Sequence, residues 1–429
     1  METSQTTTPL VPFDDYRSQI KTRLVAEMVG KKLNQLRTPA LVIDKQILER
    51  NCQRLGKIST GLNKTRVRVH VKTHKTVEGA RIQLESAKTD AIVVSTLPEA
   101  YAMIDSDLPV GGLLKQVLLG FPITPDKFSD IVHLSSKIDV FQIFIVFNAD
   151  NLSTLEALES FCKTTAIQNK INAFLKVDCG YGRAGVPINN EKTLLLAKRL
   201  SESPYIEFSG IYTHAGHSYS SQSADEALEY LKNECDIARQ FKDYFVSNEI
   251  PIECVSIGAT PTVKAITAFM DTHDMNYILR DIDEVHAGAF AFLDRQQVAT
   301  GLGTYRDVAI TVACRIASVY KERNSLLIDG GALAFSKDTA PQGGFGDVID
   351  PTVENDVGIL ASLTKVSQEH GILQHLNEST LSRPELHIGE LVRVIPNHCC
   401  LAAACHLYYL VIEGNSDVVV DVWIPVRGW

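Results

Sequence analysis

The sequence has no hydrophobic run long enough to cross a membrane, because no apolar stretch approaches the roughly 18 residues that a spanning helix needs. Its start, METSQTTTPLVPFDDYRSQ, also lacks the basic residues and apolar stretch of a signal peptide. The nine cysteines are scattered and odd in number, which favours free thiols in a reducing compartment over a disulfide framework. We therefore expect a cytoplasmic protein that contacts no membrane.

An excess of positive charge is also missing. The formal net charge is −9, and no basic patch is longer than a few residues, so nothing indicates a nucleic-acid partner. There is no low-complexity tract. The hydrophobic share of 45% and the charged share of 22% are typical of a globular protein. A chain of 429 residues favours two domains, or one large barrel with an addition.

Short apolar segments alternate with helix-like stretches between residues 67 and 288. Eight such segments are present, at 67–72, 91–95, 117–120, 143–147, 174–177, 208–213, 254–257 and 284–288. Strands that alternate with helices over this length are typical of an α/β protein with a (β/α)8 TIM barrel. A doubly wound parallel sheet has the same local pattern, and periodicity alone does not exclude it.

The pattern changes after about residue 300. Closely spaced strand-like segments, joined by Gly, Asn and Asp turns, occur at 307–320, 325–329, 390–395, 406–414 and 417–426. Residues 338–350 contain Gly and Pro and are expected to form a loop. A helix is expected at 14–36 and a strand at 38–44. We thus predict an N-terminal part, 1–45, that associates with a C-terminal mostly-β domain, 296–429, and a barrel at 46–295.

The first barrel segment, RVRVHVK at 66–72, alternates apolar side chains with cationic or imidazole ones. Alternate side chains of a strand face opposite sides, which gives one face with Val67, Val69 and Val71 and another with Arg66, Arg68, His70 and Lys72. In a barrel the second face would point inward, with Lys72 nearest the C-terminal rim, where barrel active sites lie. A desolvated lysine can lose its proton and act as a nucleophile. Interior salt bridges or a solvated edge would explain the same pattern.

The segment RVHVKTHKT (68–76) resembles the Arg-Pro-His-x-Lys-Thr-His-Lys motif of the D-serine dehydratase and D-threonine aldolase family. These are pyridoxal-phosphate (PLP) enzymes of the alanine racemase type, fold type III, with a PLP-binding barrel followed by a β domain. The resemblance implies that Lys72 carries PLP covalently and that His70 supports the ring or its surroundings. Lys75 matches the second lysine, which does not hold the cofactor. Val69 replaces the motif's proline and removes no reactive group.

Further segments resemble the family in the same order, from about residue 35 onward. They are 177–186, 210–220, 256–262, 284–290, 328–338, 367–371 and 396–400. The resemblance places Arg183, Tyr212 and Tyr219 at PLP. Backbone amides of the loops that contain Gly258 and Thr260, and Gly288 and Ala289, would hold the phosphate, since glycine permits a close approach of the backbone. The family often has Asn-Tyr in place of Ala289-Phe290. For Glu369 and His370 we expect structural roles.

The segment PNHCCLAAACH (396–406) contains several candidate metal ligands. His398 and Cys400 would share one face of an extended segment, as a pair of zinc ligands that leaves coordination positions open. A buried, thiol-rich strand is the alternative. The resemblance implies that this His-x-Cys pair binds zinc, whereas D-threonine aldolases have His-x-Asp and prefer harder ions, as ligand softness predicts. Cys405 and His406 are expected to pack.

The resemblance therefore implies a PLP- and zinc-dependent lyase that removes water from D-serine, giving pyruvate and ammonia, with weaker action on D-threonine. Lys72 would take the Cα proton, and zinc would polarise the hydroxyl group. A homodimer is expected. The alternatives are a D-threonine aldolase and an amino-acid racemase, for which Tyr212 or Tyr219 could supply a second acid. A non-catalytic PLP carrier is a third, but it would need no metal-binding domain.

Overall fold

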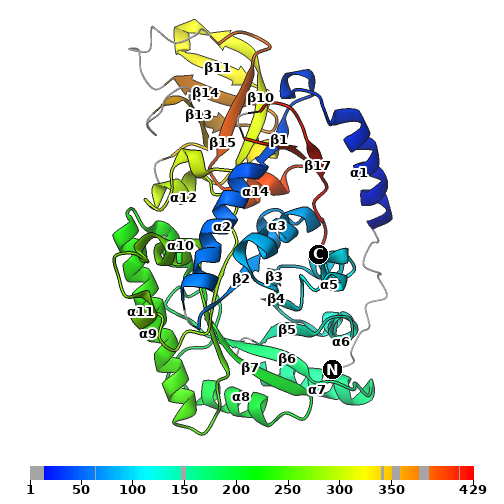
Figure 1. Ribbon diagram of the computed structural model, residues 1–429, viewed down its shortest axis with the longest axis vertical. Coiled ribbons are helices and arrows are strands. Elements are labelled where there is room, and N and C mark those ends of the chain that lie inside the picture. The colour runs from blue at the N-terminus through cyan, green and yellow to red at the C-terminus, as the bar shows by residue number, and fades with distance from the viewer. Residues whose placement is uncertain are drawn as a thin grey trace. The chain divides into compact units, whose positions relative to one another are not determined.

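The structure is a computed structural model that describes residues 14–62, 64–145, 151–339, 343–349, 358–375, 386–414 and 416–429. The chain forms two compact units, which can be followed by colour in Figure 1. Unit 1 contains Cys52–Gly288 and Val426–Trp429, and unit 2 contains residues 14–51 and Ala289–Pro425. The two units therefore divide after residues 51 and 288, where the sequence suggested limits at 45 and 295.

Unit 1 is built on a closed barrel of eight parallel strands, so the predicted TIM barrel is confirmed over the doubly wound sheet. The strands are β2 (Arg66–His70), β3 (Ala91–Val94), β4 (Gln116–Pro122), β5 (Val140–Ile145), β6 (Ile171–Lys176), β7 (Ile206–Tyr212), β8 (Cys254–Ile257) and β9 (Glu284–Ala287). Every residue of β3, β8 and β9 is buried, as parallel strands covered on both faces require. Residues 146–147 of the fourth predicted segment lie outside the described residues.

Helices follow the strands and lie outside them, as α6, α8 and α9 show in Figure 1. They are α3 (Val77–Ala87), α4 (Leu97–Ile104), α5 (Asp107–Val110), α6 (Phe128–Ser135), α7 (Asn151–Thr164), α8 (Glu191–Glu202), α9 (Ala224–Val246), α10 (Thr260–Phe269) and α11 (Met275–Ile278). The longest, α9, begins after Ser223, whose side chain accepts a hydrogen bond from Glu226 N. Its buried residues recur at helical spacing, so α9 packs one apolar face inward.

Unit 2 contains a nine-stranded sheet in the order β11-β14-β13-β12-β15-β10-β1-β16-β17. The strands are β1 (Ala40–Asp44), β10 (Ile310–Tyr320), β11 (Ser325–Ile328), β12 (Gly346–Ile349), β13 (Ile359–Val366), β14 (Gly371–His375), β15 (Leu391–Pro396), β16 (Tyr409–Ile412) and β17 (Asp421–Trp423). A further pairing of β10 with β11 closes six of these strands into a ring. The predicted C-terminal mostly-β domain is confirmed.

Two local predictions for unit 2 are wrong. Residues 338–350 are not all loop, because Gly346–Ile349 pairs with both β13 and β15. The N-terminal helix α1 is Asp14–Met28 and ends before residue 36, since Gly30 has a φ of +83° that leaves the helical region. The predicted strand at 38–44 is present as β1, which lies between β10 and β16.

The remaining helices of unit 2 are short. They are α12 (Arg295–Ala299), α13 (Ala332–Phe335) and α14 (Cys399–Ala404), with 3₁₀ turns η1 (Leu33–Gln35), η5 (Tyr305–Asp307) and η6 (Lys321–Arg323). Helix α2 (Lys45–Gly61) contains the point at which the two units divide. Among the described residues, no helix combines the length and apolar character that crossing a bilayer requires.

Candidate active site

Lys72 lies just beyond the C-terminal end of β2. The strand ends at His70, and Val71–Thr73 form a 3₁₀ turn, η2, so the predicted extended face of residues 66–72 ends too early to include Lys72. His70 Nδ1 accepts a hydrogen bond from Lys72 N at 3.2 Å and so caps this turn. The turn leaves Lys72 half-buried at the rim of the barrel, the end at which TIM-barrel active sites lie.

The two arginines of β2 differ in their surroundings. Arg68 is 1% exposed, and its Nε donates to Glu284 Oε1 of β9 at 2.8 Å. Arg68 also reaches Gln116 Oε1 of β4 at 3.2 Å, so its side chain points into the barrel. The prediction of an interior ion pair is thus confirmed for Arg68. It is wrong for Arg66, which is exposed because it is the first residue of the strand.

The second lysine of the motif, Lys75, has a structural partner. Its Nζ lies 2.9 Å from Oε1 of Glu99, whose side chain is fully buried. Its backbone oxygen accepts a hydrogen bond from Val426 N, and its φ is +55°. Lys72 forms no ion pair with any residue that the structure describes, so its amine is the one left for chemistry.

A polar network fills the interior beside Arg68. Ser256 Oγ donates a hydrogen bond to Glu284 Oε1 at 2.8 Å and lies 3.0 Å from His286 Nδ1. Because the Ser256 hydroxyl proton is used on Glu284, we assign the imidazole proton to Nδ1, which donates to Ser256 Oγ. Burial, followed by the charges of His214, Lys176 and Arg68, holds the pKa of His286 well below its usual range. A neutral His286 then has a lone pair on Nε2, a buried atom without a hydrogen-bond partner. This atom is available to a ligand.

Aromatic rings surround the second buried cation of the barrel, Lys176. Its Nζ lies 4.9 Å from the ring centroid of Phe144 and 5.7 Å from that of Tyr212. Burial, followed by the positive charges of Arg183 and Lys72, lowers the pKa of Lys176 to about 8. The Tyr212 ring stacks on His286, with 3.8 Å between centroids and 13° between planes.

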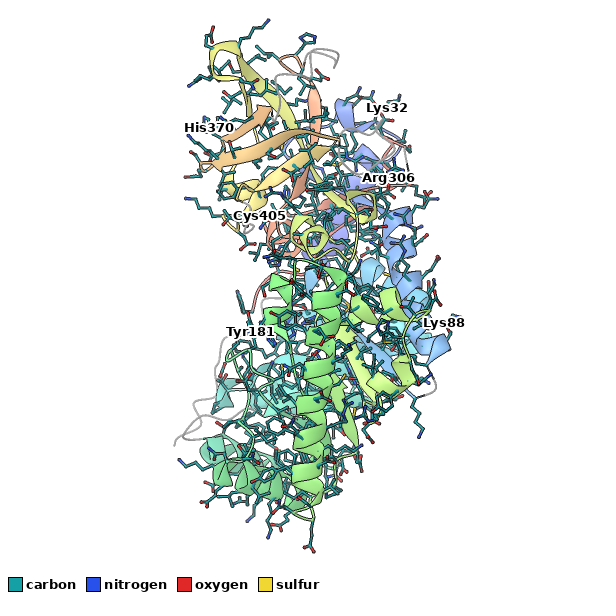
Figure 2. The ribbon with its side chains drawn as sticks, turned by 90° about the vertical axis from the view of Figure 1, so that its left-hand side faces the viewer. Lys32, Lys88, Tyr181, Arg306, His370 and Cys405 are labelled. Carbon is teal, nitrogen blue, oxygen red and sulfur yellow. The ribbon has the colours of Figure 1, made fainter. Side chains whose placement is uncertain are left out.

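The predicted PLP contacts lie at different depths. Tyr212 is the last residue of β7 and is 4% exposed, whereas Tyr219 lies in the 3₁₀ turn η4 (Gly216–Ser220) and is half-buried. Arg183 is exposed on the loop after β6, with its guanidinium 5.3 Å from the ring of Tyr181, which Figure 2 shows at the surface. Burial, followed by the charges of Lys72 and Arg183, lowers the pKa of half-buried His214. The ring of Tyr181 lies 6.1 Å from that of His214, so this loop comes near the barrel rim.

A helix N-terminus and two closely packed glycines follow the ends of β8 and β9. Helix α10 begins at Thr260, whose Oγ1 is buried and has no hydrogen-bond partner. Gly258 has a φ of +148°, and a Cβ there would collide with the backbone oxygen of His286. A Cβ on Gly288 would lie 3.0 Å from Cβ of His70. Ala289, which follows, is 4% exposed.

One predicted phosphate contact needs correction. The N–H of Gly258 donates to Glu234 Oε1 at 3.0 Å, so this amide is already engaged and is not available to a phosphate. Gly258 instead allows a close approach to the backbone of His286, and the unpartnered hydroxyl of Thr260 provides a donor. Together with the uncompensated amine of Lys72 and the free Nε2 of His286, these features fit an anionic, ring-nitrogen cofactor such as PLP.

Several interior polar residues were not singled out from the sequence. They are Lys176, His214, Glu234, Ser256, Glu284 and His286. A signal for two of them was present. Glu234 interrupts the apolar face of α9, and Lys176 ends the apolar strand INAFLK. A charged residue at an otherwise buried position indicates a partner or a function, since an unpaired buried charge is costly.

The predicted metal ligands lie in unit 2, at the start of a helix. His398 is the N-cap of α14 and Cys400 is in its first turn, so the expected extended segment is wrong. The two side chains nevertheless form a hydrogen bond to each other. Burial lowers the pKa of His398, but this hydrogen bond and the charges of Cys400, Asp294 and Asp338 outweigh burial and raise the pKa to about 9.

Neighbouring residues orient this pair. His398 Nδ1 lies 3.2 Å from Asp338 Oδ2, which leaves Nε2 of the imidazole for a metal. Cys399 N donates to Asp294 Oδ2 at 2.7 Å and fixes the first turn of α14. No cluster of three or more His, Cys, Asp or Glu side chains suited to a metal occurs within the described ranges. Imidazole plus thiolate, with open positions, fits zinc in a catalytic site.

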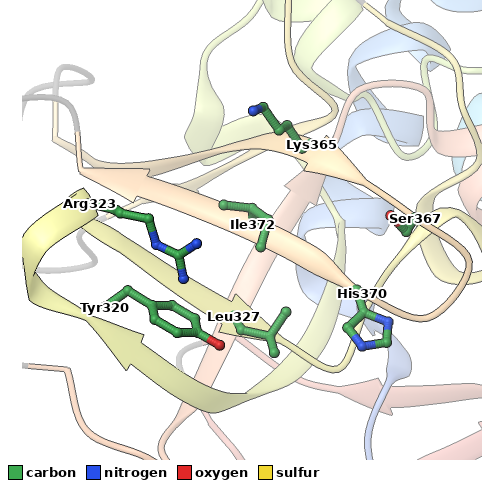
Figure 3. Close-up of a pocket in the computed structure, with 7 residues that line it drawn as sticks. All are labelled: Tyr320, Arg323, Leu327, Lys365, Ser367, His370 and Ile372. Carbon is green, nitrogen blue, oxygen red and sulfur yellow. The ribbon is translucent and has the colours of Figure 1, made fainter.

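The other candidate ligands of this segment have structural contacts. His406 is buried, with Nε2 3.0 Å from the backbone oxygen of Ala334, and Cys405 Sγ lies 3.3 Å from Leu401 O. His370 lines a pocket on β10, β11, β13 and β14 whose polar side chains point in different directions (Figure 3). Arg323 in this pocket packs on the ring of Tyr320, at 3.9 Å from its centroid. The pocket therefore offers no convergent set of ligand contacts.

Two known protein families match most of the chain. Residues 43–293 match the alanine racemase N-terminal domain, and residues 309–412 match a putative serine dehydratase domain. A D-serine dehydratase of Schizosaccharomyces pombe is 35% identical over 96% of this chain and 97% of its own length. One from Dictyostelium discoideum is 31% identical over 92% and 98%.

A solved structure agrees with these matches. D-threo-3-hydroxyaspartate dehydratase from Delftia sp. HT23 superposes with a TM-score of 0.78 at 25% identity, over 93% of this chain and all of its own. Both units of the chain are therefore shared with these relatives. The chain belongs to the D-serine dehydratase family, whose members are PLP-dependent lyases with the alanine racemase fold.

Proposed function

We propose that this protein is a PLP- and zinc-dependent D-serine dehydratase, which removes water from D-serine to give pyruvate and ammonia and acts more weakly on D-threonine. The observation that carries the proposal is Lys72, an amine without an ion-pair partner among the described residues at the C-terminal rim of the barrel. Relatives named D-serine dehydratase, 30–35% identical over nearly the full chain, support the choice of substrate.

In this proposal each of the barrel residues has a separate role in binding the cofactor or the substrate. Lys72 Nζ would hold PLP covalently and, once the amino group of the substrate has displaced it, the freed amine would take the Cα proton. The Thr260 hydroxyl and the start of α10 would hold the phosphate, beside the closely packed backbone of Gly258 and Gly288. The lone pair of His286 Nε2 would accept a hydrogen bond from a polar group of the cofactor. When bound, PLP supplies an electron sink that makes the Cα proton of an amino acid acidic.

The metal-binding residues are His398 and Cys400. Asp338 holds Nδ1 of the imidazole, so Nε2 is directed to the ion. When bound, zinc supplies Lewis-acid polarisation of a hydroxyl group, which is otherwise a poor leaving group. The thiolate of Cys400 favours zinc over harder ions, and this preference supports dehydration over the aldolase alternative.

We extend the proposal to a cytoplasmic homodimer. None of the nine cysteines forms a disulfide, and seven of them are buried, which is typical of proteins in a reducing compartment. The dimer follows from the family resemblance. Sedimentation of the purified protein at several concentrations tests it, and a monomer at all of them would contradict it.

Pyruvate formation from D-serine tests the function and the metal together. We expect activity that EDTA removes and zinc restores, and the same loss in Cys400→Ala with PLP still bound. Cys405→Ala is the matched control, since Cys405 follows the last residue of the same short helix and its Sγ has a backbone contact. Pyruvate that is insensitive to chelation would contradict the zinc proposal. Glycine from D-threonine without pyruvate from D-serine would favour the aldolase.

A further inference from the structure

Glu234 carries a buried carboxylate that none of the proposed steps uses. It lies in the middle of α9 and is fully buried, on the same apolar face as Leu231 and Ala238. A carboxylate in such a place is costly unless hydrogen-bond donors surround it. The surroundings of Glu234 supply four such donors.

Three of the donors converge on one oxygen of Glu234. Oε1 accepts hydrogen bonds from Thr213 Oγ1 at 2.5 Å, Ala215 N at 3.1 Å and Gly258 N at 3.0 Å. The other oxygen, Oε2, accepts a hydrogen bond from Thr262 Oγ1 at 3.3 Å. Thr213 and Ala215 follow β7, Gly258 follows β8, and Thr262 is in the first turn of α10. One carboxylate thus holds three separate segments at the C-terminal end of the barrel.

Each of these segments carries part of the candidate cofactor site. His214 stands between the two donors after β7, and its Nδ1 lies 2.9 Å from Gly258 O. Gly258 lets its backbone pack closely against that of His286, and Thr260 provides the unpartnered hydroxyl at the start of α10. The same side chain therefore fixes the parts that would surround a phosphate.

We propose that Glu234 is a positioning residue for PLP, whose carboxylate holds the loops after β7 and β8 and the start of α10 in the arrangement that binds the phosphate. This inference rests on the proposed use of PLP and is independent of zinc and of the substrate. Glu234 acts through Gly258, Thr262 and their neighbours. It need not contact the cofactor.

The hydrogen-bond pattern predicts which substitutions matter. In Glu234→Leu the amides of Ala215 and Gly258 lose their buried acceptor, so both loops must move to find another. In Glu234→Gln the amide oxygen can still accept the bonds made to Oε1. Its NH2 group can donate to Thr262 Oγ1, because a hydroxyl can also accept. The comparison of Glu234→Leu with Glu234→Gln therefore tests the hydrogen bonds of Glu234 more than its charge.

The experiment is an absorbance titration of PLP into the full-length protein from which PLP has been removed, alongside thermal unfolding. We expect Glu234→Leu to raise the Kd for PLP by about tenfold or more, and Glu234→Gln by less than about threefold. Leu231→Ala is the matched control, because it removes buried apolar contact one turn away and leaves the four hydrogen bonds of Glu234 in place. It should lower Tm and leave the Kd unchanged.

The outcomes separate this inference from the proposed function. A Kd in Glu234→Leu equal to that of Leu231→Ala would overturn the positioning role and leave the proposed function standing. A wild-type protein that binds no PLP would overturn both. If Glu234→Leu does not fold, Thr213→Val removes only the hydroxyl that donates to Glu234 Oε1, and we expect about a threefold rise in Kd. An unchanged Kd in that variant would overturn the positioning role.

Discussion

The candidate sites of the two units differ in how their polar groups are held. In unit 1 the ion pair of Arg68 and Glu284 is buried, and further hydrogen bonds extend it to Ser256 and His286. In unit 2 His398 and Cys400 stand at the start of a helix of six residues and depend on Asp338 and on each other. The protein alone can prearrange the first site, whereas a two-ligand metal site obtains part of its geometry from the ion.

The largest expected effect tests the choice of lysine in unit 1. Lys72→Ala should abolish covalent attachment of PLP and lower pyruvate formation by roughly 10³-fold, because both nucleophile and base are lost. Borohydride reduction followed by peptide mass spectrometry locates the attachment. Lys75→Ala is the control and should keep PLP at Lys72. Attachment found at Lys75 in the wild type would reverse the assignment.

If the buried ion pair helps to prearrange the barrel site, breaking it should cause a large loss of folding stability. Arg68→Met leaves the carboxylate of Glu284 without its charged partner and should lower the free energy of unfolding by about 3–5 kcal/mol. Urea unfolding measures this. Arg81→Met is the control, because Arg81 pairs with the exposed Asp107 at 2.6 Å, and it should cost about 1 kcal/mol or less. Equal losses in the two variants would contradict a special role of the buried ion pair in prearranging the barrel site.

Zinc binding by His398 and Cys400 in unit 2 should depend on Asp338, which orients His398. Asp338→Asn weakens the hold on His398 Nδ1 and should lower zinc affinity by about 10- to 100-fold, measured by chelator competition. PLP binding should be unaffected. Asp417→Asn, at an exposed position of the same unit, should leave zinc affinity as it is. Zinc affinity that is unchanged in Asp338→Asn would contradict the proposed orientation of His398.

The smallest expected effect concerns the pH dependence contributed by Lys176. Because folding lowers its pKa from about 10.5 to about 8, the unfolded chain binds the extra proton between these values. The stability of the PLP-free protein should therefore rise with pH in this window, by at most about 1.4 kcal/mol per pH unit, relative to Lys176→Met. Urea unfolding at several pH values measures the difference. Parallel profiles for the two proteins would show that Lys176 titrates normally.

Much of the barrel was predictable because its signals are local. Each barrel strand is a short apolar run between helices, so the spacing of these runs along the chain is enough to place them. Lys72 was predictable from its motif, but the 3₁₀ turn that carries it was not, because the alternation of 66–72 continues through Val71. The turn depends on His70 Nδ1 accepting a hydrogen bond from Lys72 N.

The remaining features depend on contacts between distant parts of the chain. Strand β12 occurs in a Gly-containing segment and is defined by its pairing with β13 and β15. The donors to Glu234 come from residues up to 28 positions away, so no short window of sequence contains them. Cys400 was singled out by its spacing from His398, yet the helix that presents it was missed because PNHCC gives no helical periodicity.

The position of β1 has a consequence for the order in which the chain acquires its structure during synthesis. Ala40 of β1 pairs with Ala313 of β10, and Leu41 pairs with Tyr409 of β16. All barrel strands leave the ribosome between these partners, so unit 1 can complete its closed sheet while β1 still has both edges open. A nascent chain stopped after residue 288 should thus expose an unpaired apolar strand, ALVID, and be a natural target for chaperones.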